Sequence, residues 1–360
     1  MKRLTLCCRR HAATRRRPRT ALRFAACTLI AGLAFGTPAA AESFAFTDGA
    51  LIEAVAADGG WVVRSAGAET PLPFDGGADV HVQQLAATTS GWLLSATSLR
   101  DHRSRLVVMQ RSGTGDAVAL PVPQTSGRVL LQPTVLADAD RRGPATLLWI
   151  EGDSARESSV RAAAWNGAGW DDTVVLSPRG AGTQIALDAL RLADGGLLAT
   201  WSAFDGDDDE VVWSHSKDGT TWSEPLPLSE NNVPDVTPAL ALVDGGAVVA
   251  WSGYDGNDYR VWTARFDGER WSDARRHGER GSVFPSFADP AAERPLLIYK
   301  QTAPSAWRIS RLDGEGAESR TLSLELSKQR PLVLGSDDEG VSLRGAAEKS
   351  AATRRVSWAQ

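Results

Sequence analysis

The sequence predicts an all-β fold: a six-bladed β-propeller built from four-stranded antiparallel blades, with seven blades as the alternative. An apolar strand, often preceded by Gly, recurs at intervals of roughly 45–55 residues, which is the length a four-stranded blade needs. Asp-Gly and Asn-Gly turns accompany these strands, and no stretch has the apolar periodicity of a helix. The strand copies are Gly91–Ala96, Ala145–Trp149, Gly196–Trp201, Gly246–Trp251, Pro295–Tyr299 and Gly340–Arg344.

Two neighbouring repeats, Leu187–Glu230 and Asp235–Gly278, match each other best. In each, a first strand ends in an Asp-Gly-Gly turn and a second strand ends in Trp201 or Trp251. An acidic loop, a third strand, an Asp-Gly turn and a fourth strand follow. The expected third strands are Glu210–Ser216 and Tyr259–Phe266, and the expected fourth strands are Trp222–Leu228 and Trp271–Arg276.

The blade count depends on how the ring closes. Five full units lie between about Val80 and Ser327, and a sixth begins at Arg330 but ends after its third strand, Arg354–Gln360. We expect a strand from residues 43–78 to supply the missing outer strand, because an open sheet edge would otherwise be exposed. Those residues hold more than one strand's worth of pattern, so a seventh, abbreviated blade is the alternative. The patterned segments are Ala50–Val55, Trp61–Arg64 and Thr70–Phe74.

Residues 1–41 have the pattern of an export signal peptide. Nine Lys and Arg residues and no acid precede or flank an apolar run, Phe24–Phe35, and an Ala-x-Ala ending, Ala39–Ala41, precedes Glu42. The run is too short to span a bilayer. The sequence therefore predicts an exported protein, periplasmic or secreted, with Sec and twin-arginine export both open. Residues 42–360 are predicted to form a single propeller domain.

Charge and cysteine content narrow the possible partners. The whole chain has a formal net charge of −5, and without the predicted leader the charge becomes about −14. Such an acidic protein is not expected to bind nucleic acid. Cys7, Cys8 and Cys27 all lie in the leader, which excludes a disulfide framework and thiol chemistry from the mature chain. We expect no membrane insertion and a monomer.

One turn carries a family resemblance. The segment Ser216-Lys-Asp-Gly-Thr-Thr-Trp222 resembles the Asp box, or bacterial neuraminidase (BNR) repeat, of sialidases, and weaker copies begin at Asn166, Asp267 and Asp313. In such a turn Asp accepts amide protons, Gly adopts positive φ and Trp packs on the sheet. We therefore expect structural roles for Ser216, Asp218, Gly219, Trp222, Asp267, Gly268 and Trp271.

The resemblance to the sialidase-like propellers implies that function lies at the opposite end of the blades, on the loops that join strands two and three. A rim of acids, arginines and aromatic residues suits a polar ligand such as a glycan or another surface polymer. The predicted ligand-binding residues on this axial face are His81, Arg100, His102, Asp205, Tyr254, Asp255 and Arg260.

The resemblance does not extend to catalysis. Family enzymes use three arginines, a Tyr activated by a Glu, and an acid/base Asp, and carry a Phe/Tyr-Arg-Ile/Leu-Pro signature that this chain lacks. No catalytic residue can be assigned. The leading hypothesis is a glycan-binding propeller without demonstrated chemistry; the alternatives are a diverged exo-sialidase or other glycoside hydrolase, and a protein-interaction platform.

Two further patterns have competing interpretations. Asp205, Asp207 and Asp209 alternate as in calcium loops, although the closing Glu is missing, so calcium and a solvated acidic hairpin are both open. No other cofactor is expected. The tryptophans that recur at one strand position, Trp149, Trp201 and Trp251, indicate packing between blades in preference to a sugar-stacking platform.

Overall fold

In the computed structural model, the described residues between Ala39 and Gln360 form strands and connecting loops. The described residues are 43–47, 50–57, 60–65, 67–74, 79–125, 129–154, 157–177, 182–288, 294–312, 318–324, 331–344 and 353–358. They contain no helix, and so none with the length and hydropathy of a membrane span. The predicted signal peptide, residues 1–41, lies outside the described residues.

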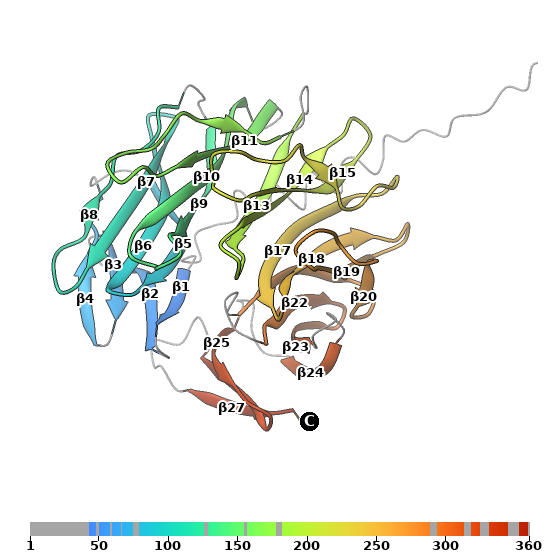
Figure 1. Cartoon of the computed structure of the whole chain (residues 1–360). Coiled ribbons are helices and arrows are strands. Elements are labelled where there is room, and N and C mark those ends of the chain that lie inside the picture. The colour runs from blue at the N-terminus through green and yellow to red at the C-terminus, as the bar shows by residue number, and fades with distance from the viewer. Residues whose placement is uncertain are drawn as a thin grey trace, which may run out of the picture. The chain divides into compact units, whose positions relative to one another are not determined.

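The strands form seven antiparallel sheets in chain order, which we number blades 1 to 7 (Figure 1). Blade 1 contains β1 (Ser43–Thr47), β2 (Ala50–Ala57), β3 (Gly60–Ser65) and β4 (Ala68–Pro71). Blade 2 contains β5 (Asp79–Thr88), β6 (Gly91–Arg100), β7 (Arg103–Ser112) and β8 (Val118–Ala119). Blade 3 contains β9 (Val129–Ala137), β10 (Pro144–Ser154), β11 (Glu157–Ala164) and β12 (Val174–Val175).

The later blades repeat this order. Blade 4 contains β13 (Gln184–Arg191), β14 (Leu197–Phe204), β15 (Asp209–Ser216) and β16 (Leu226–Pro227). Blade 5 contains β17 (Asp235–Val243), β18 (Gly246–Tyr254), β19 (Tyr259–Phe266) and β20 (Arg275–His277). Blade 6 contains β21 (Ser282–Phe287), β22 (Leu296–Thr302), β23 (Ser305–Leu312) and β24 (Glu318–Leu324). Blade 7 contains β25 (Leu332–Ser336), β26 (Gly340–Arg344) and β27 (Arg354–Ser357).

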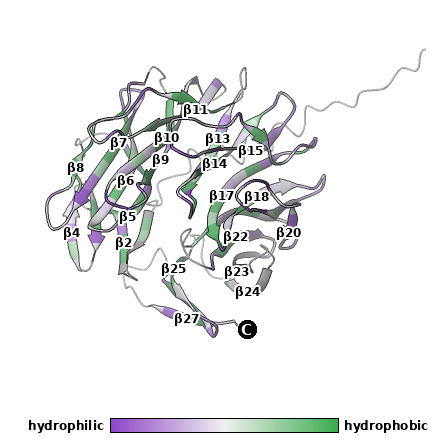
Figure 2. Ribbon diagram, viewed as in Figure 1, coloured by the Kyte–Doolittle hydropathy of each residue, from purple (hydrophilic) through white to green (hydrophobic). Residues whose placement is uncertain are grey.

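Successive blades pack face to face, as in a β-propeller. The first strand of each blade from 1 to 5 contacts the first strand of the next. Apolar clusters fill the space between consecutive blades, and blades 6 and 7 share one through Ile298 and Val341. The hydrophobic positions follow the strands and the hydrophilic ones gather in the turns (Figure 2). The prediction of an all-β propeller with antiparallel blades is confirmed.

The six-blade prediction is wrong, because the propeller has seven blades. Residues 43–71 do not add an outer strand to the last sheet: they form blade 1, in which β1 to β4 pair in order. Blade 7 is three-stranded among the described residues, and its outermost strand there is β27. Among the described residues, no N-terminal strand pairs with blade 7, so the predicted closure of the ring by such a strand is not shown.

The recurring tryptophans of strand two are buried. Trp149 and Trp201 are fully buried and Trp251 is 3% exposed. Each indole N–H donates to an acceptor inside the protein: to Glu151 at 3.1 Å, to Gln184 at 2.7 Å and to Asp235 at 2.9 Å, respectively. A ring that is enclosed and hydrogen-bonded in this way contributes to packing between blades and offers no face to a sugar.

The inner strands are bulged at one repeated position, where the backbone enters the left-handed region. The residues concerned are Gln132, Ala186, Thr237 and Phe284, with φ between 49° and 58°. At the last two, the amide is held from the preceding blade: Thr237 donates to Ser202 Oγ at 3.1 Å and Phe284 to Ser252 Oγ at 2.9 Å. These bonds set the register between blades 4, 5 and 6, and so place their loops side by side.

Candidate functional site

Two equivalent hairpins lie at the same end of blades 4 and 5. The blade 4 hairpin joins β14 to β15 through Asp205–Asp208, and the blade 5 hairpin joins β18 to β19 through Asp255–Asp258. In each, the first Asp accepts two backbone amides through Oδ1, at 2.8 and 3.1 Å for Asp205 and at 3.0 and 2.9 Å for Asp255. Gly206 (φ 113°) occupies a backbone conformation that side chains rarely adopt. The two turns are therefore the same structure built twice.

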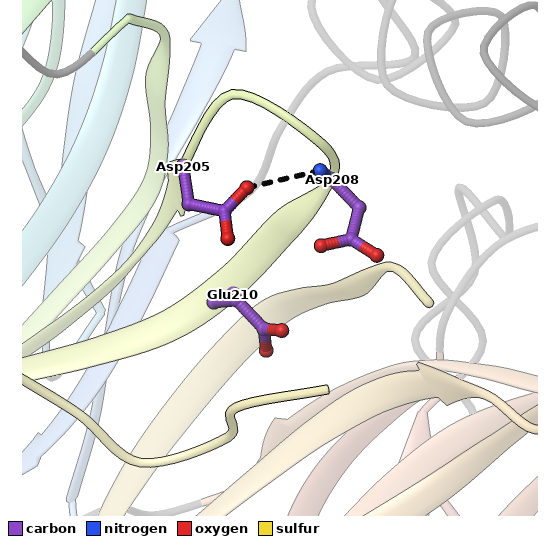
Figure 3. A group of neighbouring side chains, drawn as sticks. All are labelled: Asp205, Asp208 and Glu210. Carbon is purple, nitrogen blue, oxygen red and sulfur yellow. Dashed lines mark hydrogen bonds between the residues drawn. The ribbon is translucent and has the colours of Figure 1, made fainter. Parts of the chain in front are cut away.

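Carboxylates converge at the blade 4 hairpin (Figure 3). One oxygen from each of Asp205, Asp208 and Glu210 lies within 4.8 Å of the others. Asp205 and Asp208 belong to the turn, whereas Glu210 lies in β15 and is only 4% exposed. Three carboxylates at this separation can together bind a cation, or accept hydrogen bonds from a polyhydroxylated ligand.

Glu210 also fastens the segment that leads into blade 5. Its Oε2 accepts a hydrogen bond from Ser229 Oγ at 2.6 Å, and its Oε1 accepts one from the Asn231 amide at 2.7 Å. The Asn231 side chain donates to Asp235 Oδ2 at 2.6 Å, and Trp251 donates to Asp235 Oδ1. Two buried carboxylates thus connect blade 4, the connecting segment and blade 5 through shared donors.

The acids of this cluster are held in surroundings that disfavour their ionised forms. Burial, followed by the charges of Glu210, Asp205, Asp207 and Asp209, raises the pKa of Asp208 to about 7. Burial, then the charges of Asp205 and Glu210, raises the pKa of Asp209 to about 6. Groups with such displaced pKa values concentrate at functional sites.

The two buried carboxylates behave similarly. Burial raises the pKa of Glu210, and the hydrogen bonds from Ser229 and Asn231 oppose that shift. Burial also raises the pKa of Asp235 to about 6, against the hydrogen bond from Asn231. The connection between blades 4 and 5 therefore includes two carboxyl groups whose pKa values are raised by burial.

The blade 5 hairpin contributes aromatic rings and its own cation. The rings of Tyr254 and Tyr259 have centroids 5.2 Å apart. Burial, followed by the charge of Asp209, raises the pKa of Tyr259 to about 12, so its phenol stays protonated. Arg260 binds Asp255 at 2.7 Å, and this hydrogen bond lowers the pKa of Asp255 well below its usual range.

The predicted ligand-binding residues fall into two groups. Asp205, Tyr254, Asp255 and Arg260 lie on the hairpins of blades 4 and 5. His81, Arg100 and His102 lie on blade 2, in β5, at the end of β6 and in the turn that follows it. All three are exposed.

The three residues predicted to bind calcium are not the three whose carboxylates converge in the structure. Of Asp205, Asp207 and Asp209, only Asp205 belongs to the group with Asp208 and Glu210. In a calcium loop, alternate side chains bind one ion, but here Asp205 and Asp207 lie in a turn and Asp209 is the first residue of β15. Asp207 is exposed.

Three contributors to the site were missed from the sequence: Glu210, Asn231 and Asp235. The sequence predicts that the third strand starts at Glu210, whereas β15 starts one residue earlier, at Asp209. Glu210 joins blade 4 to the segment before blade 5 through Ser229 and Asn231, and the repeat pattern carries no information on that contact. A usable signal was the alignment of the two hairpins, in which Glu210 occupies the place of Arg260 and leaves the acids of blade 4 without an equivalent cation.

The turn that resembles an Asp box lies at the other end of β15. Asp218 accepts the amides of Thr220 and Thr221 at 2.8 Å, and these bonds lower its pKa to about 2. Gly219 has φ 81°, and Trp222 forms an isolated bridge with Ser216.

The second copy has the same form. Asp267 accepts two amides, of Glu269 and Arg270, and Gly268 has positive φ. Trp271 bridges Phe266 and packs against it and against Trp213. Because β15 and β19 run from the acidic end to these turns, the turns and the hairpin cluster lie at opposite ends of the blades.

Comparison with known proteins supports the fold. No family model matches the sequence, and no curated protein matches it. Among solved structures, a polysaccharide lyase of family PL25, an ulvan lyase, is 11% identical with a TM-score of 0.53, covering 88% of this chain and 91% of its own. The BP39L lectin from Burkholderia pseudomallei is 14% identical with a TM-score of 0.51, covering 76% and 81%. At these identities the likeness shows a shared propeller fold.

Proposed function

We propose that this chain is an exported, sialidase-like β-propeller that binds a carbohydrate at the paired hairpins of blades 4 and 5. The proposal rests on the converging carboxylates of the blade 4 hairpin and on the tyrosine pair of the blade 5 hairpin. The two hairpins are linked electrostatically, because the charge of Asp209 acts on Tyr259. Sugar hydroxyls donate to carboxylates, and sugar rings pack against aromatic faces. The fold is also that of a lyase and a lectin whose names refer to carbohydrates.

Charge restricts the kind of carbohydrate. Asp205, Asp207, Asp208, Asp209 and Glu210 follow one another within six residues, and the mature chain is strongly acidic. A glycan that carries carboxylates or sulfates would be repelled from this end of blade 4. We therefore propose that the ligand is a neutral glycan, or a glycan that carries amino groups.

The alternative of a diverged exo-sialidase gains no support at these hairpins. A nucleophilic Tyr needs a lowered phenol pKa, whereas that of Tyr259 is raised to about 12. Arg260 is bound to Asp255, which occupies a cation that could otherwise hold a substrate carboxylate. Turnover of a fluorogenic sialoside by the mature protein would nevertheless restore this alternative.

A calcium ion remains part of the proposal. Asp205, Asp208 and Glu210 provide the hard oxygen ligands that calcium prefers. One Asp205 oxygen and both Glu210 oxygens already accept hydrogen bonds, so Asp205 Oδ2 and the Asp208 carboxylate are the oxygens best placed to bind it. One calcium ion carries two positive charges against the five neighbouring acids, so anionic glycans would still be disfavoured.

The test is a glycan array probed with the mature chain, residues 42–360, with and without added calcium. We expect signals on neutral or amino-bearing glycans and weaker signals on sialylated and sulfated ones. Silence across the array would remove carbohydrate binding and leave the protein-interaction platform. Preferential binding of sialylated glycans would contradict the charge argument.

A further inference from the structure

In the described residues, the junction between blades 1 and 7 differs from the other six junctions of the ring. The described residues form six buried apolar clusters, and each of them joins two consecutive blades, from the pair of blades 1 and 2 to the pair of blades 6 and 7. None of these clusters joins blade 7 to blade 1. Within the described part of the chain, the ring therefore closes without the apolar filling that its other junctions have.

A buried ion pair bridges this junction. Arg344, the last residue of β26, binds Glu53 in the middle of β2. Only 9% of the Glu53 side chain and 21% of the Arg344 side chain are exposed. Both residues lie in the second strand of their blades, so the pair links equivalent strands of the first and the last blade.

The strand pattern explains why these two residues face each other. Side chains alternate between the two faces of a strand. Ile52 and Ala54 pack into the cluster that blade 1 shares with blade 2, so Glu53 between them faces the other way, toward blade 7. Leu343 packs into the cluster with blade 6, so Arg344 faces away from blade 6 and toward blade 1.

A buried ion pair stabilises a junction between blades differently from an apolar cluster. Its two charges lose hydration on burial, and the pair is stable only while both partners are present. Removing one partner leaves the other as an uncompensated buried charge, which the junction can relieve by admitting water. No single side chain is essential in this way to an apolar cluster, because the stabilisation is spread over many contacts.

We propose that the junction of blades 1 and 7 is a polar seam, locked by the Glu53–Arg344 ion pair, at which the ring opens before it opens anywhere else. This inference is independent of carbohydrate binding, because the seam and the hairpins of blades 4 and 5 involve different blades. The fold would then open locally at one defined junction, and Glu53 on one side and Arg344 on the other would keep that junction closed.

Hydrogen exchange measured by mass spectrometry on the mature chain tests the seam. In the unmodified protein we expect amides of β2 and β26 to exchange faster than the matching amides of β14 and β18. The substitutions E53Q and R344Q each keep the size of the side chain and remove its charge. Each should speed exchange in β2 and β26 by about tenfold or more and leave β18 unchanged, since only the seam is opened.

Two further variants make the test decisive. The swap E53R/R344E should return exchange in β2 and β26 toward the original rate, because it restores opposite charges across the seam. The control E151Q disrupts a comparably buried pair inside blade 3, Glu151 with Arg161, and should speed exchange there without affecting the seam. Equal acceleration in all blades, or none in β2 and β26, would overturn the proposal. If one variant fails to fold, the exchange rates of the unmodified protein still decide between the outcomes.

Discussion

Blade 4 turns from its second to its third strand at Asp205–Asp208, and blade 5 makes the same turn at Asp255–Asp258. The backbones match: the amide of the first Asp donates to the carbonyl of the fourth residue at 3.0 Å in both. The side chains that follow do not match. Asp209 and Glu210 in blade 4 stand where blade 5 has a tyrosine and an arginine.

The comparison shows which positions of a repeated hairpin can vary in sequence. The turn needs only its first Asp and the Gly after it, so the next positions can change without altering the hairpin. In blade 5 they provide Arg260, which binds Asp255. In blade 4 they provide further acids, and burial together with the charges of these acids raises the pKa of Asp208 to about 7. Natural folds accept such a local cost mainly where a site is needed.

The largest expected effect comes from removing the buried acid of blade 4. E210A leaves Ser229 Oγ and the Asn231 amide without their acceptor, and should lower the free energy of unfolding by about 1–3 kcal/mol. R260A, at the same position of blade 5, breaks the pair with Asp255 and should cost less, because no buried hydrogen-bond donor loses its acceptor. Urea unfolding of both variants measures the difference. Equal losses would mean that Glu210 does not fasten the blades.

A smaller effect is expected from calcium. If calcium binds the blade 4 hairpin, adding it after EDTA treatment should raise Tm by about 2–4 °C for each kcal/mol of binding free energy gained. D208N should abolish the rise, whereas D258N, its counterpart in blade 5, should keep it. A Tm that calcium does not change, measured by scanning calorimetry, would remove the ion from the proposal.

The smallest effect concerns pH. The pKa of Asp208 is raised in the folded protein, so the folded state holds a proton that the unfolded state releases between about pH 4 and pH 7. The contribution of this residue to stability is therefore favourable at low pH and is lost as the pH rises through about 7. D208N should be less sensitive than the unmodified protein over that range, by under about 1 kcal/mol because solvent screens the group. Unfolding at pH 5 and pH 8 would contradict this if D208N lost as much stability as the unmodified protein.

Much of the fold was predictable because its repeats are local. Trp201 and Trp251 mark strand two, and Asp218 with Gly219 marks a turn that any chain with this pattern would make. Blade 1 was harder to see, because its second strand has Glu53 at a buried position and no tryptophan. That glutamate is explained only by Arg344, nearly three hundred residues away.

The candidate site was predictable only in part, for the same reason. The acidic loop of blade 4 and the tyrosines of blade 5 stand out in the sequence. Their combination with Asn231 and Asp235 depends on how the blades pack, and periodicity carries no information on that. The spacing of calcium loops predicted Asp207 and Asp209 as partners of Asp205, whereas the turn at Asp205–Asp208 brings Asp208 and Glu210 to it.

The most direct test is isothermal titration calorimetry with a glycan that the array identifies, applied to the unmodified protein, D208N and D258N. The two variants make the same change at equivalent positions of the same turn. Binding through the acids of blade 4 predicts that D208N weakens the affinity at least about tenfold, a change of about 1.4 kcal/mol, and that D258N leaves it intact. Unchanged affinity in D208N, or an equal loss in both, would contradict the assignment of the site to blade 4.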